Sequence, residues 1–257
     1  MGERQPKSII GQATWETARR LVHPEIEGIH NLEIIGAHLE NGGTAIGYAN
    51  HRLGLLGLRD LLEAGIAVED HIKPSPHHAG VFVSRWHTDP RNGIFARIKH
   101  YFLIEKWPES PGIMMFPVVQ DKDKDNVLYS ADWREFNDNA YNQAEEFASL
   151  PGHMLLITPE GERGSELQEA EVGVAALFRK LRKTALAIPL ALPYSESKVI
   201  AGTPYSWDEL LEDHKRNPNI RTKDRMMVRL ALLLSPQYRG FYAQMASEFV
   251  MPPESNS

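Results

Sequence analysis

The hydrophobic and polar positions of this chain follow two alternating patterns. Short apolar runs bounded by Gly, Pro or Asn predict strands, and stretches with apolar residues three and four apart predict helices. The expected strands are 44–49, 80–84, 113–119, 154–158 and 185–192, and the expected helices among them are 53–62, 93–102, 133–150 and 172–181. This order predicts an α/β fold with a mainly parallel central sheet and helices on both faces. Pro117 cannot donate a ladder hydrogen bond, which favours an edge position or a strand end for 113–119.

The ends of the chain read differently from its middle. Two short helices are expected at 15–22 and 32–39, and after Pro193 the pattern gives only helices, at 204–214, 222–234 and 237–250. We therefore expect an N-terminal helical arm (1–24), an α/β domain (25–200) and a C-terminal helical extension (201–257). A chain of 257 residues is long enough for one large core with such an extension.

Charge and composition narrow the classes of function. With 34 acidic and 28 basic side chains the net charge is −6, which argues against a nucleic-acid partner. The chain has no Cys, so a thiolate nucleophile and a zinc site built on sulfur are excluded. The charged run 121–125 lacks the turn glycine and distal Glu of a calcium loop, so we expect a solvated loop and no metal.

The sequence also bears on membranes. The first residues lack the apolar core of a signal peptide, and no window approaches 18 uninterrupted apolar residues. We expect a cytoplasmic protein, soluble or peripheral on the membrane. Basic residues gather in the final third of the chain, where a basic helical face could contact an anionic membrane, or the same helices could pack on their own domain and solvate their charges.

The loop after the expected strand 154–158 carries candidate binding residues. Pro159 ends the strand, and Glu160, Gly161 and Arg163 follow it. Ligands of open α/β sheets bind outside the carboxyl ends of the strands. The Arg163 guanidinium suits phosphate oxygens, and Gly161 permits close approach to the backbone. The alternative is an exposed polar turn, since these residue types are common in loops.

A second polar group follows the expected strand 44–49. Asn50 and His51 stand at its carboxyl end, so they are expected to meet the Glu160 loop at one edge of a parallel sheet. A histidine there can act as a general base because its ordinary pKa is near neutrality. The alternative is a hydrogen-bonded structural histidine.

These motifs occur in an order that resembles the glycerophospholipid acyltransferase superfamily, which includes lysophosphatidic acid and glycerol-3-phosphate acyltransferases. The resemblance covers about two thirds of the chain, from about 25 to 194. It rests on Gly28 with Asn31-Leu32, on Asn50-His51-Arg52, on Thr158-Pro-Glu-Gly-Glu-Arg163, and on Ala187-Ile-Pro-Leu190.

The resemblance implies an O-acyltransferase. In it, His51 would be the general base that takes the proton of an acceptor hydroxyl as the oxygen attacks an acyl thioester. Asn50 and Arg52, together with Glu160, Gly161 and Arg163, would bind substrate. The donor would be an acyl-CoA or acyl-carrier-protein thioester and the acceptor a phosphate-bearing glycerolipid, without a further cofactor or a covalent acyl-enzyme. The Ile188-Pro189 strand would line the site.

One departure from the family pattern concerns the partner of His51. The family has an Asp five residues after the His, and Leu56 stands there. On a helix, Asp60 would lie roughly 13 Å from His51 along the axis and out of reach, which leaves Asp89 or Glu105 as candidate partners. Leu56 supports an alternative function, namely a catalytically impaired relative that binds lipid or an acyl carrier. A third possibility is hydrolysis, with water as the acceptor.

A second departure concerns the middle motif. The family usually has an Arg after a strand, and Gln120 and Asp121 occupy that place after 113–119. Arg97 or Lys122 are the candidate substitutes.

Overall fold

The structure, a computed structural model, describes residues 16–17, 19–20, 22–52, 59–72, 78–84, 89–94, 97, 113–120, 124–126, 129, 131–161 and 163–251. Its centre is a seven-stranded sheet in the order β1-β7-β6-β2-β5-β3-β4. The strands are β1 (Glu25–Glu27), β2 (Thr44–Ala49), β3 (His78–Ser84), β4 (Ile113–Val118), β5 (His153–Ile157), β6 (Ala185–Ala191) and β7 (Lys198–Ala201). All neighbouring pairs are parallel except β6 with β7.

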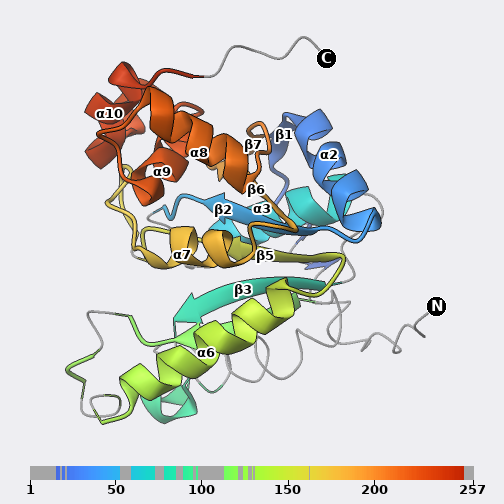
Figure 1. The fold of residues 1–257 in the computed structure, drawn as a ribbon. Helices are drawn as coiled ribbons and strands as arrows, with labels where there is room; N and C mark the ends of the chain where they lie inside the picture. Colours follow the sequence, from blue (N-terminus) through green and yellow to red (C-terminus); the bar gives the residue numbers. More distant parts are fainter. Residues whose placement is uncertain are drawn as a thin grey trace.

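Helices cover both faces of this sheet (Figure 1). They are α2 (Ile29–Glu40), α3 (Arg59–His71), α6 (Trp133–Ala148), α7 (Gly173–Lys180), α8 (Trp207–Arg216), α9 (Thr222–Ala231) and α10 (Ala243–Glu248). Short 3-10 turns occur at η1 (Pro90–Asn92), η5 (Pro236–Tyr238) and η6 (Gly240–Tyr242). The expected α/β fold with a mainly parallel sheet is confirmed.

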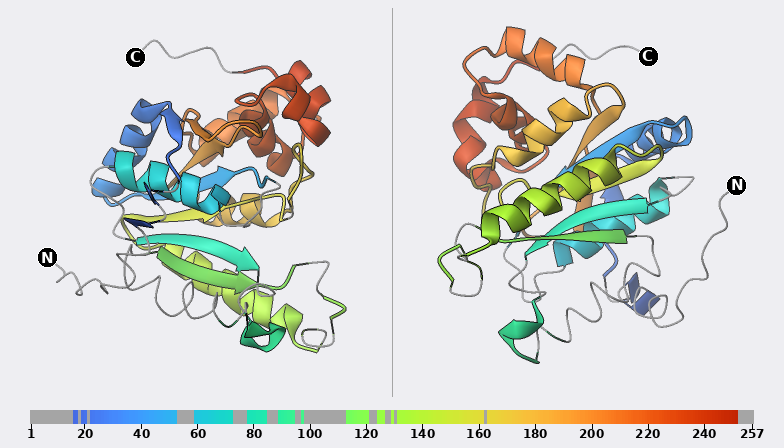
Figure 2. Two further views of the ribbon diagram at one scale, coloured as in Figure 1. Left: turned by 180° about the vertical axis from the view of Figure 1, so that it is seen from behind. Right: turned by 60° about the horizontal axis from the view of Figure 1, so that its bottom comes forward.

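The central strand β2 divides the core into two halves because its side chains alternate between the faces. Ile46 and Tyr48 are buried with helices α6 to α10, and Ala45 and Ala49 are buried with α2 and α3. Figure 2 shows α6 lying along β3 and β4 at one end of the sheet. Ile188 of β6, which was expected to line the active site, is fully buried in the half with α2.

The expected strands are all present, and β4 lies at the sheet edge, as its Pro117 indicated. Two short strands, β1 and β7, were missed; they pair with each other at the other end of the sheet. Of the helix expected at 53–62, residues 59–62 belong to α3, which runs to His71, and residues 53–58 lie outside the described part. Most of the helix expected at 93–102 and the arm 1–15 also lie outside it.

The C-terminal helices pack against the same core as the sheet. Met226, Met227 and Leu230 of α9 are fully buried together with Ile46 and Tyr48 of β2. The Tyr48 hydroxyl donates to the carbonyl of Met226 (3.0 Å), which ties the central strand to α9. No helix in the described ranges has both the length and the apolar character to cross a membrane.

Candidate active site

His51 lies immediately beyond the end of β2, and its imidazole contacts a carboxylate from α3. Its Nδ1 is 3.0 Å from Oδ2 of Asp60, and the two side chains are 16% and 9% exposed. The parallel strands β2 and β5 bring the loop after β5 to the same edge of the sheet. A histidine held by a carboxylate therefore lies where the sequence placed the candidate site.

The expectation that Asp60 is out of reach of His51 was wrong. It assumed one helix from His51 through Asp60, whereas neither His51 nor Arg52 is helical. The rise of 1.5 Å per residue therefore does not separate the two residues. Asp60 lies in the first turn of α3 and points back to the end of β2. Of the two other candidates, Asp89 binds Arg91 through both oxygens, and Glu105 lies outside the described part.

Arg52 holds Asp60 in place. Its backbone N–H donates to Oδ2 of Asp60 and its Nε to Oδ1, each at 2.8 Å. Its remaining guanidinium donors bind the carboxylate of Glu63 and the carbonyls of Pro193 and Glu196. Arg52 is only 7% exposed. The structure therefore directs this guanidinium into the protein and not toward a substrate, contrary to the expected binding role.

The charge state of Asp60 follows from these contacts. Burial alone would raise the pKa of its carboxyl, but the hydrogen bond from His51 and the positive charge of Arg52 outweigh burial and lower the pKa below its ordinary value. Asp60 is consequently a carboxylate at neutral pH, available to orient the imidazole.

Asn50 joins the end of β2 to the end of β6. Its Nδ2 donates to the carbonyl of Leu192 (2.9 Å), and its Oδ1 accepts from the N–H of the same residue (2.7 Å). Asn50 is fully buried. Its amide thus replaces a strand pairing where β2 ends, and it fixes the backbone that carries His51 rather than offering the amide to a substrate.

Glu160 links the loop after β5 to His51. Its Oε2 accepts from the backbone N–H of His51 (2.6 Å) and its Oε1 from that of Gln168 (2.7 Å). The side chain is 3% exposed. Burial raises the pKa of Glu160 to about 8 although both backbone donors favour its charged form. Glu160 therefore positions the backbone of His51 and is not itself open to a ligand.

Gly161 has a φ of +67°, a left-handed conformation that favours glycine. The turn is closed by a hydrogen bond from its N–H to the carbonyl of Thr158 (3.2 Å). Its own carbonyl accepts from Nε2 of Gln120, just beyond β4. Gln120, in the place of the family's middle-motif Arg, thus reaches the predicted loop. Arg97 instead donates to the carbonyl of Pro90, and Asp121 and Lys122 lie outside the described part.

Arg163 completes the cluster from the other side of the imidazole. Its Nε donates to Nε2 of His51 at 3.3 Å. A guanidinium can only donate and a carboxylate only accept, so the two neighbours of His51 together select one tautomer. The proton resides on Nδ1, facing Asp60, and Nε2 carries the lone pair that accepts from Arg163. This is the form in which an imidazole takes up a proton.

Two further residues at this edge were not identified from the sequence. Glu63 is fully buried and binds both Arg52 and the hydroxyl of Ser197 (3.0 Å). The ring of Tyr194 packs on Tyr238 with 5.0 Å between centroids, and burial and the charge of Glu160 raise the pKa of its hydroxyl. The only sequence clue to the contact between Arg52 and Glu63 was that they are eleven residues apart. This spacing indicates a contact only once the position of α3 relative to β2 is known.

No group of three or more His, Cys, Asp or Glu within the described ranges could hold a metal ion. The site therefore consists of His51, the carboxylate of Asp60 and the guanidinium of Arg163, and it is supported by hydrogen bonds of Asn50 and Glu160 with the backbone.

A scan against models of protein families and a search of curated proteins both found no match for this chain.

Proposed function

We propose that this protein is an O-acyltransferase that moves a fatty acyl group from a coenzyme A or acyl-carrier-protein thioester to a hydroxyl of a phosphate-bearing glycerolipid. The observation that carries the proposal is the contact of Asp60 with Nδ1 of His51 at 3.0 Å, which leaves Nε2 unprotonated beside Arg163. The order of motifs along the sequence supports the same assignment.

His51 is the general base in this reaction. Its Nε2 takes the proton of the acceptor hydroxyl while that oxygen attacks the thioester carbonyl carbon. The tetrahedral intermediate then collapses, the carbon–sulfur bond breaks, and the proton on Nε2 passes to the leaving thiolate. Asp60 stabilises the positive charge that His51 carries between these steps, as the aspartate of a catalytic triad does.

Arg163 binds the phosphate of the acceptor. Its guanidinium lies beside Nε2, so a phosphate drawn to it brings a nearby hydroxyl to the base. The hydroxyl replaces Arg163 as the hydrogen-bond donor to Nε2 when the acceptor binds. Arg52 and Asn50 act as positioning residues, because their polar groups are bound within the protein.

The alternative of a catalytically impaired relative rested on Leu56, since it left His51 without a carboxylate. Asp60 supplies that carboxylate, which removes the reason for preferring a purely binding function. Leu56 itself lies outside the described part of the chain. Hydrolysis requires the same base, so only the acceptor distinguishes it from transfer.

The test is acyl transfer from a palmitoyl thioester to glycerol-3-phosphate and to lysophosphatidate. We expect His51→Ala to lower kcat by about 10²–10⁴, the usual contribution of a general base. Arg163→Gln is expected to raise KM for the acceptor at least tenfold while the donor KM stays within twofold. An exposed cation elsewhere, in Lys183→Gln, is the matched control. Full turnover by His51→Ala, or fatty acid release unaffected by either acceptor, contradicts the proposal.

A further inference from the structure

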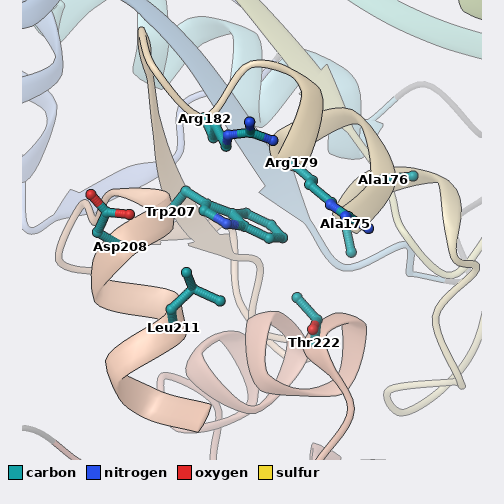
Figure 3. A pocket seen from close by; sticks show the side chains of 8 residues that line it. All are labelled: Ala175, Ala176, Arg179, Arg182, Trp207, Asp208, Leu211 and Thr222. Carbon is teal, nitrogen blue, oxygen red and sulfur yellow. The ribbon is translucent and has the colours of Figure 1, made fainter. Parts of the chain in front are cut away.

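A groove lies between α7, α8 and the start of α9, outside the candidate active site (Figure 3). Its volume is about 620 Å³, within the range of small-molecule sites. Two alanines of α7 line it together with Arg179, Arg182, Trp207, Asp208, Leu211 and Thr222. Figure 3 shows both arginines on one side of the Trp207 indole and Leu211 on the other.

The arginines of this groove are distant from His51. Arg182 lies in the turn that leads into β6, and β6 begins beside Thr44, the first residue of β2. His51 follows the opposite end of β2, a strand of six residues. At about 3.3 Å per residue the strand separates the two edges by roughly 17 Å.

Neither arginine has a partner within the described ranges. Lys180, between them in sequence, forms an ion pair with Glu145, but Arg179 and Arg182 form no ion pair or hydrogen bond with any described residue. Asp208 also lines the groove and pairs with neither. Two guanidinium groups that line one groove and are not paired with a carboxylate are suited to an anion, and their planar forks match phosphate oxygens.

Trp207, Leu211 and the two alanines form the apolar part of the lining. The indole of Trp207 is held edge-on to Phe178, with 5.5 Å between centroids, and it is 8% exposed. Leu211 is 41% exposed, which is high for a large apolar side chain beside a cavity. A free phosphate ion would leave this apolar surface in water. A ligand with both a phosphate and an aliphatic part would use the whole groove.

We propose that this groove binds a phospholipid, with the headgroup phosphate between Arg179 and Arg182 and the start of an acyl chain on Trp207 and Leu211. The charge of the two arginines matches an anionic headgroup, and Trp207 and Leu211 line the same groove together with Asp208 and Thr222. The site is separate from the substrate site proposed above and does not depend on catalysis.

The experiment is a calorimetric titration of the whole protein with monomeric dihexanoyl phosphatidate and, separately, with inorganic phosphate. We expect the lipid to bind and its Kd to rise at least tenfold in the Arg179→Gln, Arg182→Gln double variant. Leu211→Gln is expected to raise the Kd at least threefold. Lys183→Gln and Leu150→Gln are matched controls, since both replace exposed residues outside the lining, and each should leave the Kd within twofold.

Binding at the candidate active site is separated by Arg163→Gln, which should leave the groove's affinity for the lipid unchanged. The proposal is overturned if the lipid does not bind, if binding survives the double arginine variant, or if inorganic phosphate binds as tightly as the lipid. Arg179, Arg182 and Leu211 are exposed, so their replacement by Gln is expected to leave the protein folded. The outcome is independent of whether the protein transfers acyl groups.

Discussion

Replacing Asp60 by asparagine removes the negative charge next to His51 while keeping the shape of the side chain. Oδ2 of Asp60 faces two donors, Nδ1 of His51 and the N–H of Arg52, and Oδ1 faces only Nε of Arg52. The new amide NH₂ is therefore least unfavourable at the Oδ1 position. In that orientation His51 keeps its hydrogen bond and loses only the charge.

The size of the effect follows from the geometry. Two unit charges about 3.5 Å apart at an effective dielectric constant near 20 interact by about 4–5 kcal/mol. The opposing charge of Arg52 reduces this, so about 3–4 kcal/mol of imidazolium stabilisation is lost. Each 1.36 kcal/mol is a factor of ten in rate, which gives a fall in kcat of about 10²–10³. Since Asp60 does not touch the substrate, the KM values should stay within threefold.

The assay is acyl transfer under saturating thioester and acceptor, with urea unfolding of the same preparations. The amide facing Nε of Arg52 is expected to lower the free energy of unfolding by about 1–3 kcal/mol, which leaves the protein folded. Asp70→Asn is the matched control, because Asp70 lies on the same helix and pairs with Arg19 away from the site. Turnover by Asp60→Asn within threefold of the unaltered protein would refute the role assigned to this carboxylate.

Two further changes test the loop after β5. Burial raises the pKa of Glu160 to about 8 from an ordinary 4.5, so the folded state retains a proton that the unfolded state has lost. The stabilisation due to this proton is complete below pH 4.5 and is lost as the pH rises to 8. Relative to Glu160→Gln, the free energy of unfolding measured by urea titration should therefore fall by up to about 1.4 kcal/mol per pH unit between pH 5 and 8. The same pH dependence in both proteins would contradict this. Gly161→Ala and its control Gly42→Ala both place a side chain at positive φ. Each variant should therefore lose about 1–2 kcal/mol of stability, measured by chemical denaturation. Only Gly161→Ala should also lower the rate of acyl transfer. Equal turnover in the two alanine variants would mean that the Gly161 turn does not position Arg163.

The sequence alone determined the central strands and the edge of the sheet at which polar loops gather. Buried strands such as β2 and β5 are continuous apolar runs, and residues such as Pro159 and Gly161 end them locally. Parallel strands present their carboxyl ends at one edge, so the approach of His51 to the Glu160 loop needed only the fold class. These features depend on residues that are neighbours in sequence.

The tertiary structure alone decided which polar groups touch. Helix geometry between His51 and Asp60 would have kept the two apart, yet His51 and Arg52 are not helical and Asp60 of α3 contacts Nδ1 of His51. The same contacts turn Arg52 and Glu160 inward, because their partners come from other parts of the chain.

Weak local signals failed for a related reason. Strands β1 and β7 have three and four residues and depend on pairing, β1 with β7 and β7 also with β6, so no pattern within either one predicts them. The groove of Arg179, Arg182 and Trp207 joins two helices whose separate patterns show only their own apolar faces. Hydrophobic spacing reports which side of an element is buried, whereas pairing, tautomers and cavities arise from the packing of one element on another.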